Sequence, residues 1–298
     1  MLSQLSALLV PALLVGFVNG HGHVATIIAN GQSYVGGLPH NAPSTAVGWA
    51  AGNQDNGFVA PDAFTSPDII CHRNARPVAN AATVTAGSTL TLKWDTWPES
   101  HHGPVIDYLA PVTGAFASID KTSLRWTKIA QKGLISGYNP GNWAAGQLIS
   151  QGNSWTVTIP RNLRPGNYVL RHEIIALHSG GQVNGAQAYP QCINLKVTGS
   201  GSGTLQGGDF RTFYTPQDPG ILFNLYQSFS SYPIPGPPVQ RTRASHPESE
   251  VVQTANDVQI PKSFAAVIER DNQLKNNDLG VSDSPHSNVN RHLKVREC

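Results

Sequence analysis

Histidine is the residue type in this 298-residue sequence with the clearest capacity for chemistry. There are eleven histidines, and His21 is the most informative, because cleavage after Gly20 would leave it at the N-terminus. An N-terminal histidine offers two nitrogen ligands, its α-amino group and its ring Nδ1, which can chelate one metal ion. The pKa of an α-amino group is about 7.7–8.0, so a metal ion can displace its proton near neutral pH.

A second imidazole facing His21 would complete a set of three nitrogen ligands. A planar set of this kind favours Cu(II), which also leads the affinity order of the divalent metals, whereas zinc prefers a tetrahedral set. His101 and His102 are adjacent and are followed by glycine and proline, which predicts a rigid loop between strands. A single histidine is more often structural than a ligand, but two in a rigid loop weaken that interpretation.

Four more candidate residues lie in two later segments. His172 and His178 are six residues apart, and an even separation on one strand places both side chains on one face. Gln187 and Tyr189 share a face in the same way if their strand is regular. A tyrosine in a strand is usually a core aromatic, so Tyr189 admits a structural role as well as a chemical one.

Residues 1–20 have the pattern of a signal peptide. They are mostly apolar, and Val18 and Gly20 occupy the −3 and −1 positions of a cleavage site. The apolar run is shorter than the roughly 20 residues that a membrane span needs, and Pro11 interrupts it. We therefore predict a secreted protein with no membrane partner, in which His21 is the first residue and a disulfide can form.

The elements that must position these residues are predicted to be short strands. Only 13% of the residues are charged, and 29 glycines and 22 prolines are typical of a loop-rich β protein. Strands are expected at 24–28, 88–94, 154–159, 168–177 and 192–198. Helical periodicity is weak, and only 220–226 is expected to form a short helical turn. The pattern predicts an all-β, immunoglobulin- or fibronectin-like sandwich with long loops and short helical turns.

The composition changes after Pro238. Residues 239–298 hold 16 of the 38 charged residues but only one aromatic residue, which predicts a disordered tail of unknown role after a domain at 21–238. The formal net charge of the whole chain is only +2, which gives no reason to expect nucleic acid as a partner. Three cysteines allow one disulfide and one remaining thiol.

Six segments together resemble the fungal lytic polysaccharide monooxygenases of auxiliary activity family 9, formerly glycoside hydrolase family 61. The matching segments are His21-Gly22, Ser66-Pro-Asp-Ile-Ile-Cys-His72, Trp97-Pro-Glu-Ser-His-His-Gly-Pro-Val105, Pro165-Gly-Asn-Tyr-Val-Leu-Arg-His-Glu-Ile-Ile-Ala-Leu-His-Ser179, Gln187-Ala-Tyr-Pro-Gln-Cys-Ile-Asn-Leu195 and Pro219-Gly-Ile-Leu222. They follow the family's order and span roughly residues 21–238, so the resemblance covers most of the chain.

The resemblance implies one copper ion and names its ligands. His21 matches the ligand that binds through its amine and ring, and His101, rather than His102, matches the second histidine. Tyr189 matches the axial tyrosine. His178 and Gln187 match the pair that hydrogen-bonds to the reacting oxygen species.

The resemblance also implies one disulfide and a substrate-stacking residue. Cys71 and Cys192 match the family's widely spaced bridge. Tyr226 matches a tyrosine that stacks on glucose rings, although a hydrophobic contact tying the C-terminal segment to the sandwich is an equal alternative. Arg171 and Glu173 lie on the strand that leads to His178 and are expected to be structural supports.

The activity implied is oxidative cleavage of a polysaccharide, most of all crystalline or soluble cellulose. It would use O2 or H2O2 and an external electron donor, and the enzyme would act as a secreted monomer. Three alternatives stay open: a copper-delivery protein using the same chelate, a non-catalytic carbohydrate-binding sandwich, and a hydrolase. The first has no need of His178 and Gln187, the second no need of His21, and no carboxylate pair supports the third.

Overall fold

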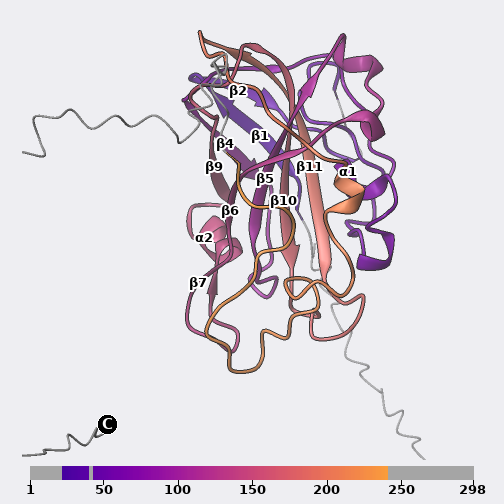
Figure 1. The fold of residues 1–298 in the computed structure, drawn as a ribbon, viewed down its shortest axis with the longest axis vertical. Coiled ribbons are helices and arrows are strands. Elements are labelled where there is room, and N and C mark those ends of the chain that lie inside the picture. Colours follow the sequence, from indigo (N-terminus) through magenta and orange to yellow (C-terminus); the bar gives the residue numbers. More distant parts are fainter. Residues whose placement is uncertain (1–21, 40–42, 241–298) are drawn as a thin grey trace, which may run out of the picture. The chain divides into compact units, whose positions relative to one another are not determined.

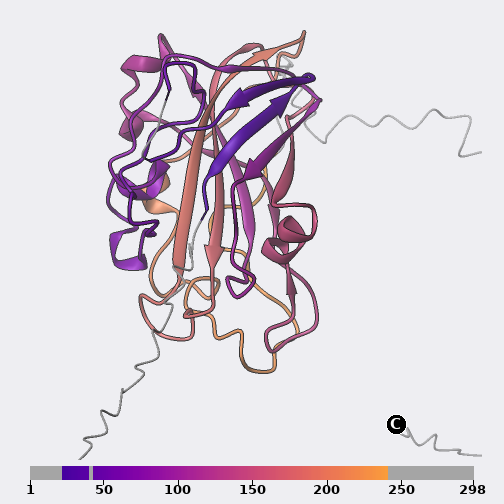
Figure 2. The same ribbon diagram turned by 180° about the vertical axis from the view of Figure 1, so that it is seen from behind.

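The computed structural model describes residues 22–39 and 43–240, which form two β-sheets packed as a sandwich (Figure 1 and Figure 2). The four-stranded sheet has the order β2–β1–β4–β9, with bounds Gln32–Val35, Val24–Ala29, Thr89–Trp94 and Ser154–Thr158. The five-stranded sheet has the order β3–β11–β10–β5–β6, with bounds Ala82–Thr85, Gln187–Thr198, Gly166–Ala176, Val105–Val112 and Thr127–Lys132. The predicted all-β sandwich is confirmed.

The remaining elements are short. A two-stranded sheet pairs β7 (Leu134–Ser136) with β8 (Asn142–Trp143). The α-helices are α1 (Asp68–Cys71) and α2 (Ala144–Ser150), and single 3₁₀ turns lie at Pro61–Ala63, Phe116–Ser118, Lys121–Ser123 and Phe210–Thr212. None of the helices in the described part of the chain is long and apolar enough to cross a membrane.

The expected helical turn at 220–226 is wrong in kind. The segment contains turns but no helix, and the amides of Ile221 and Leu222 both donate to the Asp218 carbonyl, at 2.8 and 2.9 Å. Pro219 and Gly220 favour such a turn, since proline fixes φ and glycine bends the chain freely. The helices α1 and α2 have seven residues or fewer, which is too short for a helical periodicity to be recognised in the sequence.

β10 packs against a different hydrophobic cluster on each of its two faces. Leu170 and Ile174 face the other sheet, whereas Val169 and Ile175 face a second apolar layer formed by α1, the loops and the segment around Phe210. A strand buried on both faces reads as a nearly continuous apolar run, which is why its alternation is hidden in the sequence.

Residues just after Pro238 contact the five-stranded sheet. The Gln240 amide donates to the Lys128 carbonyl of β6 at 2.9 Å. The predicted signal peptide, His21 and the rest of the predicted tail lie outside the described residues.

The strand pairing decides where the candidate residues meet. β10 and β11 are antiparallel with Ala176 opposite Gln187, so the end of one strand and the start of the other lie at the same end of the sheet. In Figure 1 this is the lower end, where the loops after β10 and the β7–β8 hairpin also lie.

Candidate metal centre

Three separate sequence segments converge at the end of β10. The Leu177 amide donates to the His102 carbonyl at 2.8 Å and the Ile175 amide to the Pro104 carbonyl at 3.2 Å, so the loop before β5 lies along the end of β10. Gly103 is required for this approach, because a Cβ there would lie 1.8 Å from the Ile175 carbonyl oxygen. The pairing brings the loop that carries His101 against the residue stretch that carries His178.

His101 lies in direct contact with His178. Their ring centroids are 4.0 Å apart with an interplanar angle of 33°. The Ser100 hydroxyl lies 3.1 Å from His101 Nδ1, and Trp97 Nε1 donates to the His101 carbonyl at 3.1 Å. Both bonds fix the orientation of the His101 residue within its loop.

Tyr189 and Gln187 form a second part of the same site. The Tyr189 hydroxyl donates to Gln187 Oε1 at 2.6 Å, as expected for two residues on one face of β11. The Tyr189 side chain is 1% exposed, and burial raises the pKa of its phenol, which therefore stays neutral. Tyr189 is thus both a core aromatic, packed on Trp97 at 5.0 Å, and a polar neighbour of Gln187.

His178 has the feature that most distinguishes the site. Its Nδ1 is buried and has no hydrogen-bond partner in the described part of the chain, which is uncommon for a buried polar atom. Burial, and then the nearby His102, lower the pKa of His178, so its imidazole is neutral at neutral pH. The position holds a neutral imidazole able to accept or donate one hydrogen bond.

His172 does not join this group. β10 ends at Ala176, so His178 lies beyond the strand and the expectation that the two histidines share a face is wrong. His172 is buried between the sheets, where Nε2 accepts from Trp94 Nε1 at 3.0 Å and Nδ1 lies 2.7 Å from Asp107 Oδ1. Its nitrogens are both occupied, so His172 is a structural residue.

The other predicted residues take different places. Tyr226 is 52% exposed, on the segment that follows the turn at 218–222. His21 lies outside the described residues, so its contacts are not described. Among residues 22–39 and 43–240, no group of three or more His, Cys, Asp or Glu side chains is arranged to hold a metal ion.

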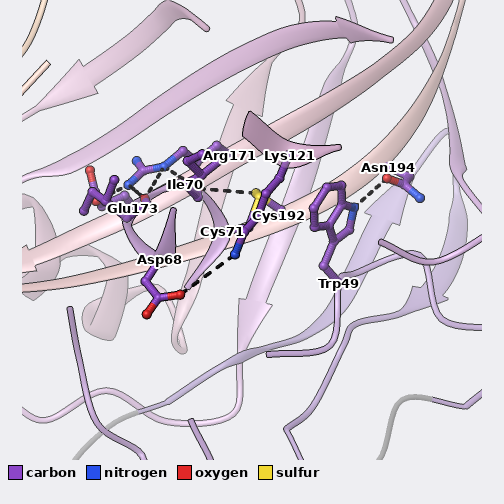
Figure 3. The surroundings of a disulfide bond; sticks show 10 residues. Trp49, Asp68, Ile70, Cys71, Lys121, Arg171, Glu173, Cys192 and Asn194 are labelled. Atoms are coloured by element: carbon purple, nitrogen blue, oxygen red, sulfur yellow. Dashed lines mark hydrogen bonds and ion pairs between the residues drawn. A yellow bond between two sulfur atoms is a disulfide. The ribbon is translucent and has the colours of Figure 1, made fainter. Parts of the chain in front are cut away.

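The predicted disulfide is present and ties α1 to β11. Cys71 and Cys192 are bonded across 121 residues, and a bridge that closes so long a loop strongly restricts the unfolded chain (Figure 3). Beside it, Arg171 donates from Nη2 to the Ile69 carbonyl at 2.7 Å and from Nε to the Ile70 carbonyl at 2.8 Å (Figure 3). Arg171 therefore joins β10 to the α1 backbone beside the disulfide.

The family model of Auxiliary Activity family 9 (formerly GH61) matches residues 21–232. The chain belongs to Auxiliary Activity family 9. It is accordingly a monooxygenase, an oxidoreductase. It is 63% identical over 226 residues to the AA9 family lytic polysaccharide monooxygenase F of Malbranchea cinnamomea, an alignment covering 76% of this chain and 93% of that protein.

Two solved structures of the same family have the same fold. The extended catalytic domain of H. jecorina LPMO9A superposes with a TM-score of 0.71 at 49% identity, covering 75% of this chain and 94% of that one. A cellulose-active polysaccharide monooxygenase from M. thermophila superposes with a TM-score of 0.66 at 30% identity, covering 75% and 100%.

Trp97 is a residue of this monooxygenase that reasoning from the sequence missed. Its ring meets His101 edge-on at 5.9 Å and Tyr189 edge-on at 5.0 Å, so one indole fixes the spacing of the two candidate ligands. The signal was available, because Trp97 stands four residues before His101, but only the fold shows that it also contacts β11.

Proposed function

We propose that this chain is a secreted, copper-dependent monooxygenase that cleaves β-1,4-glucan chains with O2 or H2O2 and an external electron donor. The observation that supports it most is the convergence of His101, His178, Gln187 and Tyr189, from three segments, at one end of the sandwich. The M. thermophila structure of this fold is described as cellulose-active, which favours cellulose as the substrate.

The groups that would hold copper are the amine and ring of His21, the ring of His101 and the phenol of Tyr189. Because Ser100 engages Nδ1 of His101, we assign metal binding to Nε2. Nitrogen donors with one neutral oxygen fit copper better than magnesium or calcium, and the unmatched Nδ1 of His178 fits a site completed by a further molecule. Copper bound there would supply one-electron chemistry and activation of the oxidant.

The residues around the ligands would guide the oxidant. Gln187 Oε1 already accepts from Tyr189, so the amide NH2 of Gln187 is the group left to donate a hydrogen bond to the oxidant. His178 holds a neutral imidazole beside His101 and would hold or pass a proton there. Such outer partners tune a metal centre without binding the metal.

Tyr226 is the proposed contact to the sugar. The alternative, a hydrophobic contact that ties its segment to the sandwich, is performed by its neighbours. Leu225 is fully buried, and Phe223 and Tyr232 both pack against Trp143, with Tyr232 at 4.9 Å. Tyr226 remains half-exposed, which suits stacking on a pyranose ring.

The test uses protein processed so that His21 is the first residue, loaded with copper and supplied with reductant and cellulose. We expect oxidised oligosaccharides. Tight copper binding without products would favour the delivery protein, and cellulose binding without copper affinity would favour the binding module. The control carries one extra residue before His21; full activity of that protein would refute the proposed chelate.

A further inference from the structure

The start of β1 is held by an unusually complete set of contacts. The His23 amide donates to Asp95 Oδ1 at 2.7 Å, and the Asp95 amide donates back to the His23 carbonyl at 3.0 Å. Gly22 lies so close to the next segment that a Cβ there would be 1.7 Å from the Thr96 carbonyl oxygen. The backbone of residues 22–23 therefore has one fixed path along residues 95–96.

The His23 side chain is fixed as firmly as its backbone. It is 5% exposed, and its Nε2 lies 2.9 Å from the Nδ2 of Asn53, which is itself 2% exposed. On the other side of the ring, His23 Nδ1 lies 3.9 Å from Asp95 Oδ2. The His23 ring thus lies between Asn53 and Asp95.

Asn53 is in turn anchored to the disulfide region. The Gly52 amide donates to the Arg73 carbonyl at 2.7 Å, and Asn53 Nδ2 also lies 3.4 Å from Nε2 of His72, the residue after Cys71. The start of β1 is therefore connected, through two buried side chains, to the covalent bridge on β11.

We infer that Gly22, His23, Asn53 and Asp95 form an N-terminal clamp that positions the amine and ring of His21 for copper. The inference rests on the proposed function. His21 is bonded to Gly22, and consecutive Cα atoms are separated by about 3.8 Å, so the fixed backbone of residues 22–23 sets the point from which the proposed ligand can reach the metal. A ligand held in place before the metal arrives loses less conformational entropy on binding. These residues are positioning residues, because none of them is proposed to touch the metal.

The test compares correctly processed variants by two measurements. Asn53→Leu keeps the number and branching of the side-chain heavy atoms and removes the bond to His23. His23→Phe keeps a ring and removes both nitrogens. We expect either variant to weaken Cu(II) affinity about tenfold or more in a competitive titration. We also expect faster hydrogen exchange of the residue-23 amide in the copper-free protein, a readout that needs no metal.

The control for general instability is Asn194→Ala. Asn194 is equally buried and bonded to Trp49 and to the Val78 carbonyl, but it contacts no clamp residue. It should lower the melting temperature without changing copper affinity. The clamp is refuted if either folded clamp variant keeps wild-type affinity, or if Asn194→Ala weakens binding equally.

A His101→Ala arm separates this inference from the proposed function. If His101→Ala keeps copper affinity, the proposed centre is wrong. If His101→Ala loses it while Asn53→Leu keeps it, the centre stands and only the clamp is wrong.

Discussion

Buried polar side chains lie both in the middle of β10 and just past its end, but their hydrogen-bonding partners differ. In the middle, Arg171 pairs with Glu173, and Tyr214 donates to Glu173 Oε2 at 2.8 Å, all fully buried. The Arg171 guanidinium also lies 3.6 Å from the centre of the Phe210 ring. At the end, His178 keeps a buried nitrogen with no partner in the described chain.

The presence or absence of a partner distinguishes structural residues from candidate reactive residues better than residue type does. In the middle of the strand, Arg171 and Glu173 pair their charges and both ring nitrogens of His172 have partners, although Arg171 Nη1 has none in the described chain. Paired charges of this kind stabilise the fold. His178 Nδ1 has no such partner in the described chain, and the ring lies beside His101 at the end of the sandwich, where it can bind a ligand or substrate. The comparison predicts that substitutions in the two regions fail in different assays.

The largest effect is expected for Glu173→Ala. Removing one partner of a buried ion pair leaves Arg171 charged and unpaired, which costs about 3–5 kcal/mol of unfolding free energy. Denaturant unfolding of the copper-free protein measures it. Glu173→Gln, which keeps an oxygen for Tyr214, should cost less, and an Ala variant as stable as the wild type would contradict the supporting role.

A smaller free-energy change, seen in another assay, is expected for His178→Ala. Loss of one oriented group at the reacting centre should lower kcat about 100-fold. Because His178 lies past the strand and has an unmatched nitrogen, the unfolding free energy should change by less than about 1 kcal/mol. A variant that loses stability but keeps kcat would reverse the comparison between the two regions.

The sandwich could be predicted from the sequence because its strands either alternate apolar and polar residues or form continuous apolar runs. The strand predicted at 88–94 corresponds to β4 and that at 154–159 to β9, each within one residue. It also identified Cys71 with Cys192, since the matching segments carry both. Alternation with a period of two and short motifs can be recognised from the sequence alone.

What the sequence could not show depends on distant contacts. His172 and His178 look alike in the chain, and only the end of β10 at Ala176 separates a buried structural ring from a candidate reactive one. The roles of Trp97 and Asn53 arise from partners on other strands, with Asn53 meeting His23 across 30 residues. No local propensity records such pairings.

The smallest effect concerns a second interior cation, Lys128, which has no carboxylate partner of its own among the described residues. Lys128 is 1% exposed, and its Nζ donates to Gln131 Oε1 and the Pro235 carbonyl, both at 2.7 Å. Burial lowers its pKa to about 8, whereas the unfolded chain keeps the ordinary value near 10.5.

The unfolded state therefore binds more protons than the folded state between pH 8 and pH 10.5. The stability that Lys128 contributes rises with pH across that window and is lost as pH falls through about 8. The slope is at most about 1.4 kcal/mol per pH unit. Urea unfolding at pH 7.5 and 9.5 should show this rise in the wild type but not in Lys128→Met, and an equal pH dependence in both would show that an interior cation needs no carboxylate to keep its usual pKa.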